Sequence, residues 1–449
     1  MTVHATPHDA TKPALRGRLQ RLAFSSPGTA EKSIYLAVFA LLVASRIPVV
    51  FLEGRFWAED GLVYFRAGWE LPWRQALFLV YAGYLNLAAS LTGVVTAKAI
   101  TWHWLSLADA PFITTSLALA LQCVPAAIIL TSSESFLRAR LATISALLLV
   151  MLAPISQEVW ISAALSQFHL AFAATLILAF AVPRHTGATC FQLTILILAA
   201  LSGPATWMLT PLFLLRAIFD RSTGRWLQLI AVAGATAIAT LFFFEPSDRT
   251  LGISPTLLGA AVFIKHIAAP LLGFQIADDI GKDLIAQFQA NAAPLWPLLT
   301  VLGIACLGAI AMARHIQSPL PWLFTAAALL ACGSYYGSIG GDKSFLVAVI
   351  PGGRYALAPN LAVALGLLYL AMRGSWPEKL VSAILVCWLI GVGASEYYSS
   401  PVALFTEGPN WRDEVAEWQQ NPAHALKIWP QGWDIRLSPD HRPIPQSPR

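Results

Sequence analysis

Residues 33–61 read SIYLAVFALLVASRIPVVFLEGRFWAEDG, an apolar run that ends in a loop of aromatic and acidic residues. The run from Ser33 to Leu52 has the length at which an apolar helix crosses a bilayer, about 20 residues. Glu59 and Asp60 follow it closely, and an ionised side chain beside hydrocarbon is costly enough that it usually has a function. The stretch therefore predicts a membrane helix with a functional loop at its exit.

The composition extends this prediction to the whole chain. Of the 449 residues, 57% are hydrophobic and 12% are charged, and the mean hydropathy is +0.63. A soluble domain carries about 25% charged residues. The apolar runs lack the alternation of barrel strands, and a backbone in lipid must satisfy its own hydrogen bonds, so these runs are expected to be helices. We therefore expect an all-α polytopic membrane protein.

Cysteine spacing and charge exclude several other classes. The five cysteines are not paired at metal-ligand spacing, which argues against a zinc site or a disulfide framework. The net charge of +5 is what basic cytoplasmic loops produce. No basic patch is interleaved with aromatic residues, so no nucleic-acid partner is expected.

The basic residues between the apolar runs set the topology, because cytoplasmic loops are rich in Lys and Arg. Residues 1–32 form a basic tail on the cytoplasmic side, residues 33–395 the transmembrane domain and residues 396–449 an exported tail. Crossing helices after the first are expected near 111–131, 139–154, 168–183, 190–202, 204–219, 226–244, 294–313, 319–338, 355–372 and 378–395. This gives about eleven transmembrane helices, a cytoplasmic N-terminus and an exported C-terminus.

Residues 53–110 are then the first exported loop. Its apolar run from Ala76 to Ile100 is broken by Gly83, Asn86 and Gly93, so we expect it to lie along the membrane or re-enter. If residues 84–100 crossed the membrane instead, the charge rule would fail at several loops.

Three other segments have recognisable patterns. Ser202-Gly203-Pro204 joins two short apolar runs, either as half-helices around a site or as a tight turn. The loop 245–291 is expected to hold an interfacial amphipathic helix that does not cross. In the exported tail, 411–420 has helical spacing and 427–437 alternates like a strand or hairpin, and its four tryptophans are expected to pack it on the exported mouth.

On this topology the polar clusters gather on the exported face. Arg354, in Gly352-Gly353-Arg354-Tyr355, begins a helix, where a guanidinium and free N–H groups together suit a phosphate. It is either a phosphate ligand or the structural partner of Asp342 or of a tail carboxylate. Further candidates, each also open to a structural interpretation, are Lys343, Lys265, His266 and Arg66 for an anion, Gln167, His169 and Glu158 for sugar hydroxyls, and Tyr81 and Tyr84 for a lipid groove.

The motif Trp57-Ala58-Glu59-Asp60-Gly61-Leu62-Val63-Tyr64-Phe65, followed by Tyr81-Ala82-Gly83-Tyr84-Leu85, resembles the first exported loop of GT-C class membrane glycosyltransferases. The resemblance implies juxtamembrane helices in this loop and a polyprenyl-phosphate sugar donor. It also implies a lipid, glycan or protein acceptor outside the cytoplasm. A bacterial inner membrane is the expected location.

Sugar transfer to a hydroxyl needs a base, and Asp60 is the candidate. Glu59 either raises the pKa of Asp60 by like-charge repulsion or helps it to bind a divalent cation, Mg²⁺ or Mn²⁺. A structural alternative is that both acids only cap a helix that starts near Gly61. Two other functions stay open: a transporter or flippase of a lipid-linked or small polar solute, and a non-catalytic subunit of an envelope-glycan assembly.

Overall fold

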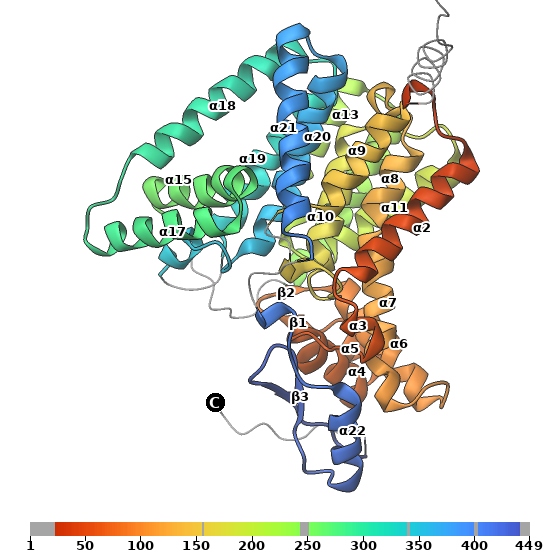
Figure 1. The fold of residues 1–449 in the computed structure, drawn as a ribbon. Helices are drawn as coiled ribbons and strands as arrows, with labels where there is room; N and C mark the ends of the chain where they lie inside the picture. Colours follow the sequence, from red (N-terminus) through yellow and green to blue (C-terminus); the bar gives the residue numbers. More distant parts are fainter. Residues whose placement is uncertain (1–22, 155–156, 243–250, 339–341, 399–402, 441–449) are drawn as a thin grey trace, which may run out of the picture.

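The computed structural model describes residues 23–154, 157–242, 251–338, 342–398 and 403–440, so most of the basic tail lies outside the described residues. Long helices form a bundle, and short elements form a smaller body at one end of it (Figure 1). The expected helical fold is confirmed. The bundle contains α2 (Thr29–Ser45), α7 (Ala110–Gln122), α8 (Val124–Thr131), α9 (Arg140–Met151), α10 (Ser166–Ala179), α11 (Thr186–Ala200), α12 (Pro204–Trp207), α13 (Thr210–Asp220), α14 (Thr223–Leu241), α18 (Trp296–Arg314), α19 (Leu320–Tyr336), α20 (Leu357–Arg373) and α21 (Trp376–Ser395).

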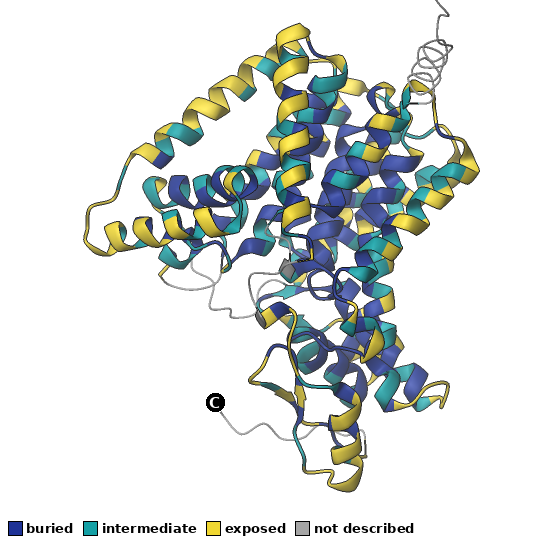
Figure 2. Cartoon of the chain, in the orientation of Figure 1, coloured by how far each residue is buried: buried dark blue, intermediate teal, exposed yellow. Residues whose placement is uncertain are grey.

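Several of these helices qualify as membrane spans by length and composition. Within the described residues six continuous helical segments do so: Leu107–Thr131, Thr223–Leu241, Pro255–Leu272, Trp296–Arg314, Gly353–Arg373 and Trp376–Ser395. Most of α18 and the outer side of α21 are exposed (Figure 2), which suits apolar helices that face lipid. A membrane protein is therefore the class that the structure supports, while the number of about eleven crossings stays a prediction.

The Ser-Gly-Pro junction is a sharp bend. The α11 helix and the segment Pro204–Asp220 meet at 115°, and together they are apolar enough to form one broken span. Gly203 has φ +150°, and a Cβ there would lie 2.1 Å from Oε1 of Gln167. Only glycine fits so close to another chain segment at this backbone angle. The bend therefore brings the start of α12 against the start of α10.

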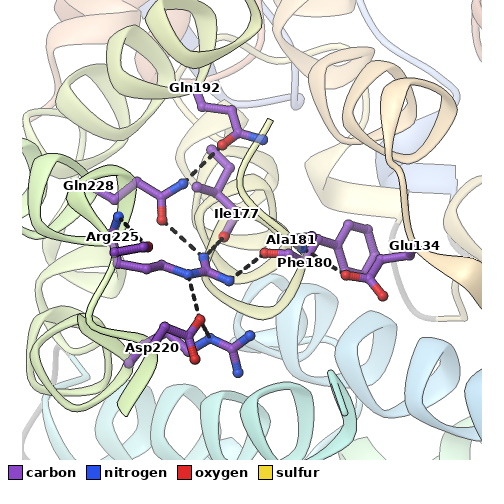
Figure 3. Close-up of polar contacts among 10 residues, drawn as sticks. Glu134, Ile177, Phe180, Ala181, Gln192, Asp220, Arg225 and Gln228 are labelled. Atoms are coloured by element: carbon purple, nitrogen blue, oxygen red, sulfur yellow. Dashed lines mark hydrogen bonds and ion pairs between the residues drawn. The ribbon is translucent and has the colours of Figure 1, made fainter. Parts of the chain in front are cut away.

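The α10 helix is the buried centre of the bundle. All residues from Ser166 to Ala179 are buried (Figure 2). At its C-terminal end Arg225 donates to the carbonyl oxygens of Ile177 at 3.0 Å and Phe180 at 2.7 Å, and to Asp220 at 3.0 Å (Figure 3). A positive charge at a helix C-terminus also interacts favourably with the helix dipole. Arg225 thus satisfies carbonyl groups that a buried helix end would otherwise leave unpaired.

Residues 255–289 differ in part from the sequence prediction. They form α15 (Pro255–Phe263), the π-helical turn η5 (Ile264–Ala268), α16 (Ala269–Leu272) and α17 (Phe274–Gln289). In Figure 1 α15 and α17 run across the direction of α21, as expected for interfacial helices. By length and composition, however, Pro255–Leu272 also qualifies as a span, a property that the sequence interpretation did not assign to it.

The first loop (residues 53–110) is a compact set of short elements. They are α3 (Val49–Leu52), at its entrance, the π-helix η1 (Asp60–Phe65), α4 (Arg66–Glu70), α5 (Trp73–Leu77), β1 (Val80–Tyr81), β2 (Tyr84–Leu85), α6 (Leu87–Thr101) and η2 (Leu107–Asp109). β1 and β2 pair antiparallel around Gly83, and the Asn86 side chain accepts from the N–H of Ala89 to begin α6. The predicted break in the run from Ala76 to Ile100 therefore lies where a glycine turn and an N-cap residue interrupt it.

The C-terminal tail folds as predicted and packs on the first loop. Its elements are η8 (Ala403–Phe405), α22 (Trp411–Gln420), and the antiparallel pair β3 (Leu426–Ile428) and β4 (Trp433–Ile435). Trp411 is buried and donates to the carbonyl of Leu107 at 2.9 Å, and Trp69 donates to the carbonyl of Ser438 at 2.9 Å. The remaining short turns are η3 (Ser135–Leu137), η4 (Gln157–Val159), η6 (Ser344–Val347) and η7 (Gly353–Ala356).

Candidate functional site

A cavity of about 650 Å³ lies between the first loop and the bundle. Glu59, from the loop, and Arg354, from the turn before α20, both line it. The two regions that the sequence singled out for an acid and for a cation therefore meet. Among the predicted site residues, those that line the cavity are Glu59, Tyr81, Tyr84, Gln167, Arg354 and Tyr355.

Arg354 forms an ion pair across the mouth of the bundle. Its Nη1 atom lies 3.1 Å from Oε1 of Glu158, so its partner is neither Asp342 nor a tail carboxylate, as the structural alternative had supposed. Gly352, with φ +71°, makes the turn that places this side chain at the foot of α20. Burial raises the pKa of Glu158, and the nearby guanidinium opposes that rise. The pair therefore keeps a cation at the cavity wall.

Asp60 and Glu59 point to different surroundings. The Asp60 side chain is only 5% exposed, and its two carboxylate oxygens accept from the backbone N–H groups of Ala164 at 2.6 Å and Ala163 at 3.2 Å. Burial raises its pKa to about 7. Asp60 is absent from the cavity lining, whereas the partly buried Glu59 is present. Asp60 thus holds the chain segment that leads into α10.

This arrangement also corrects the alternative in which Glu59 and Asp60 only cap a helix that starts near Gly61. Glu59 occupies the N-cap position of η1, but its side chain makes no capping hydrogen bond to that helix. The acid that acts at a helix entrance is Asp60, and the helix concerned is α10, which begins about a hundred residues later. A carboxylate near an N-terminus complements the helix dipole, as Arg225 does at the other end.

Phenol and amide groups form a polar wall beside Glu59. Gln167 donates from Nε2 to the hydroxyl of Tyr84 at 3.0 Å and to the carbonyl of Ala164 at 3.1 Å. Tyr64 and Asn86 line the same cavity and were not predicted as site residues. Asn86 carries a signal that could have identified it, because an asparagine within an apolar run seldom lacks a polar partner. Such groups can donate to and accept from the hydroxyls of a ligand.

Much of the remaining cavity lining is apolar. The Phe168 ring meets the Tyr355 ring at 5.8 Å, and both line the cavity. Further lining residues that the sequence interpretation did not select are Leu165, Pro204, Ala205, Trp207, Met208, Leu251 and Tyr336. Among the described residues, the cavity lining thus combines one acid and one cation with an extended hydrocarbon surface.

Lys265 and His266 lie away from the cavity lining, on η5. The Nζ atom of Lys265 donates to the carbonyl oxygens of Ala348, Val349 at 3.0 Å and Pro351 at 2.8 Å. His266 bonds through Nδ1 to Asn360 at 2.6 Å and through Nε2 to the Tyr335 hydroxyl at 2.8 Å. Lys265 thus holds the segment before Gly352, and His266 links α19 to α20. Neither residue lines the cavity.

Three other candidates are also outside the cavity lining. Lys343 donates to the carbonyl of Tyr336 at 2.6 Å, at the end of α19. Arg66 pairs with Glu70 at 3.1 Å, one turn along the same helix. His169 is fully buried with its ring 4.8 Å from the Trp160 ring, and neither ring nitrogen has a hydrogen-bond partner. The structure does not bring these side chains to Glu59 and Arg354.

No family model, curated protein or solved structure matches this chain. The geometry of the cavity is therefore the basis for assigning a function.

The acids of the first loop fit a divalent cation poorly. Both carboxylate oxygens of Asp60 are engaged by backbone N–H groups, which leaves Glu59 as the acid of this pair at the cavity. Hard cations prefer several oxygen ligands at once. Within the described part of the chain, the one group of three close potential ligands is Glu414, Glu417 and His424, in the tail. No chemical step is assigned to a metal here.

Proposed function

We propose that this protein is a membrane glycosyltransferase of the GT-C type. It transfers a sugar from a polyprenyl-phosphate carrier to a lipid, glycan or protein acceptor on the exported face of the membrane. The observation that carries the proposal is the shared cavity of Glu59 and Arg354, which combines an acid, a cation and hydrocarbon surface beside apolar helices. A lipid phosphate sugar needs all three features at once.

Arg354 is the proposed ligand of the carrier phosphate. A guanidinium binds phosphate oxygens through two parallel N–H bonds, and its charge stabilises the negative charge of the leaving group. Its Nη1 atom is anchored by Glu158, while 31% of the side chain remains exposed. The ion pair therefore orients the guanidinium without enclosing it.

Glu59 is the proposed base, in place of Asp60. As the acceptor oxygen attacks the anomeric carbon, its hydroxyl proton passes to a carboxylate. The bond between the anomeric carbon and the phosphate oxygen breaks, and that oxygen keeps the electron pair beside Arg354. Glu59 lines the cavity and Asp60 does not, so Glu59 is the acid of the first loop that an acceptor can reach.

The walls of the cavity suit the two halves of such a donor. The pair of Gln167 and Tyr84 offers donors and acceptors to sugar hydroxyls, next to Glu59. Trp207, Met208 and Leu251 offer apolar surface for the isoprenoid chain. Burial of that chain would contribute most of the affinity, at roughly 25 cal/mol per Å² of apolar area.

Transfer from a panel of undecaprenyl-phosphate hexoses, in nanodiscs supplemented with membrane extract as acceptor, tests the proposal. Glu59→Gln is expected to abolish labelled product, by about 100-fold or more, and to retain binding of undecaprenyl phosphate. Arg354→Ala is expected to lose that binding. Arg66→Ala, which removes a cation outside the cavity, is the matched control. Full transfer by Glu59→Gln would overturn the assignment of the base.

One observation favours a second candidate, a flippase for a lipid-linked solute. Broken spans near a binding cavity are common in transporters, and the 115° bend at Ser202-Gly203-Pro204 adjoins this cavity. Movement of a labelled lipid-linked sugar across proteoliposomes, without a covalent product, would favour this function over glycosyl transfer.

A further inference from the structure

The C-terminal tail contacts the backbone next to Glu59. The N–H of Trp429 donates to the carbonyl of Phe56 at 3.1 Å, and the N–H of Ala58 donates to the carbonyl of Trp429 at 2.5 Å. Trp57 and Trp429 thereby form a parallel bridge between two segments far apart in sequence. The residue that follows this bridge in the first loop is Ala58, and the next is Glu59.

Ala58 adopts a left-handed backbone conformation that the tail supports. Its φ is +36°, which costs an L-residue other than glycine free energy unless the surroundings impose it. The bond from its N–H to Trp429 is one such constraint. The tail makes a second close contact just after Asp60, since a Cβ on Gly61 would lie 2.7 Å from Cδ1 of Ile435 in β4. The tail thus packs on both sides of Glu59 and Asp60.

Arg55 ties the same bridge to the bundle. Its guanidinium lies 5.1 Å from the Trp57 ring and 5.4 Å from the Trp429 ring, within reach of a cation–π contact with each. It also donates to the carbonyls of Trp160 and Ile161, both at 3.3 Å. The buried cation therefore joins the tail, the first loop and the segment that leads into α10.

We propose that the tail segment around Trp429 is part of the candidate site, and that Trp429 is a positioning residue for Glu59. The Trp429 main chain holds Ala58 in its left-handed conformation, and this directs the Glu59 side chain into the cavity. The role of Glu59 in chemistry rests on the function proposed above, whereas its direction does not. Without the tail contact, Glu59 would lose its fixed place opposite Arg354.

Gly408 offers a way to displace Trp429 without altering the first loop. A Cβ at Gly408 would lie 2.5 Å from the Trp429 ring, so Gly408→Ala should push the ring and its main chain away. The exposed neighbour Glu407 provides the control Glu407→Ala. Ala58→Pro acts from the other side, because proline has no N–H and cannot adopt a positive φ. Ala58→Gly keeps both and should behave as the wild type.

Two readouts on the full chain in nanodiscs test the proposal. Hydrogen exchange at Ala58 should accelerate by about tenfold or more in Gly408→Ala and stay unchanged in Glu407→Ala. Carbodiimide labelling of Glu59, followed by mass spectrometry, reports its direction. Bound undecaprenyl phosphate should shield Glu59 from carbodiimide labelling in the wild type, in Glu407→Ala and in Ala58→Gly. In Gly408→Ala and Ala58→Pro it should leave the labelling of Glu59 unchanged.

The outcomes separate this proposal from the proposed function. Unchanged protection of Glu59 in Ala58→Pro, or in Gly408→Ala despite faster exchange at Ala58, would overturn the positioning role. Protection in the wild type without any sugar transfer would overturn the glycosyltransferase and leave the positioning role standing. Absence of protection in the wild type would overturn the proposed lipid-phosphate ligand. The positioning role would then be overturned if Gly408→Ala and Ala58→Pro left the rate of carbodiimide labelling of Glu59 unchanged.

Discussion

The Nη1 atom of Arg354 lies 3.1 Å from Oε1 of Glu158, across 196 residues of sequence. The two side chains join the turn η4, before α10, to the turn η7, before α20. Each charge is partly removed from water, so neither is stable at this position without the other. The pair is therefore both a structural link and the support of the proposed phosphate ligand.

The coupling between these two residues is measurable in a double-mutant cycle. Arg354→Ala and Glu158→Gln should each lower the free energy of unfolding, and their coupling energy should be on the order of 1–3 kcal/mol, as for hydrogen bonds to charged groups. Denaturant unfolding in detergent gives the four values. Lys282 and Asp278, one turn apart on α17 and with Lys282 largely exposed, form the comparison pair, for which about 0.5 kcal/mol or less is expected. Equal coupling in the two pairs would contradict the prediction.

Asp60 should make stability depend on pH. Burial raises its pKa to about 7 in the folded protein, above the value near 3.8 of an unperturbed aspartate. The folded state thus binds the proton more tightly, so this contribution to stability is fully present below about pH 4 and is lost as the pH rises through about 7. Tm of the wild type, followed by tryptophan fluorescence, should fall more between about pH 5 and about pH 8 than Tm of Asp60→Asn. Parallel pH profiles would show that Asp60 does not titrate in this way.

Arg225 should be essential for the stability of the bundle. Arg225→Met would leave the carbonyls of Ile177 and Phe180 unpaired inside the protein and would remove a partner of Asp220. A loss of about 2–4 kcal/mol in the free energy of unfolding is expected, because two buried carbonyl groups would lose their donor, at roughly 1–3 kcal/mol each. The same substitution at the exposed Arg184 should change stability by less than about 0.5 kcal/mol. A small effect at Arg225 would mean that water replaces its bonds.

Gly93 should tolerate no side chain. A Cβ at this position would lie 2.2 Å from the carbonyl oxygen of Tyr64, so Gly93→Ala must separate α6 from η1. We expect a loss of at least about 1–3 kcal/mol and a weaker affinity for undecaprenyl phosphate, because Tyr64 lines the cavity. Gly234→Ala in α14, where nothing lies within 4 Å of the added atom, should be neutral or stabilising by up to about 1 kcal/mol. Thermal melts and lipid-binding isotherms distinguish the two variants.

Local patterns in the sequence predicted much of the fold. Long apolar runs predict membrane helices because hydrocarbon leaves a backbone few alternatives, and the helix α22 spans Trp411–Gln420, the residues whose aromatic spacing predicted it. The hairpin of β3 and β4 likewise follows from alternation within 427–437. Segment 255–272 was harder to assign, because an apolar helix of this length can either cross a membrane or lie beside it.

Local patterns in the sequence were therefore enough to predict the membrane class, the helices and the general region of the candidate site. The folded arrangement of the chain was needed to show which of two adjacent acids faces the cavity and which partner Arg354 has. It also assigned Asp60 and Lys265 to backbone groups instead of a ligand. The physical reason is range: hydrophobic periodicity acts over a few residues, whereas the partner of a buried charge is set by packing between segments a hundred or more residues apart.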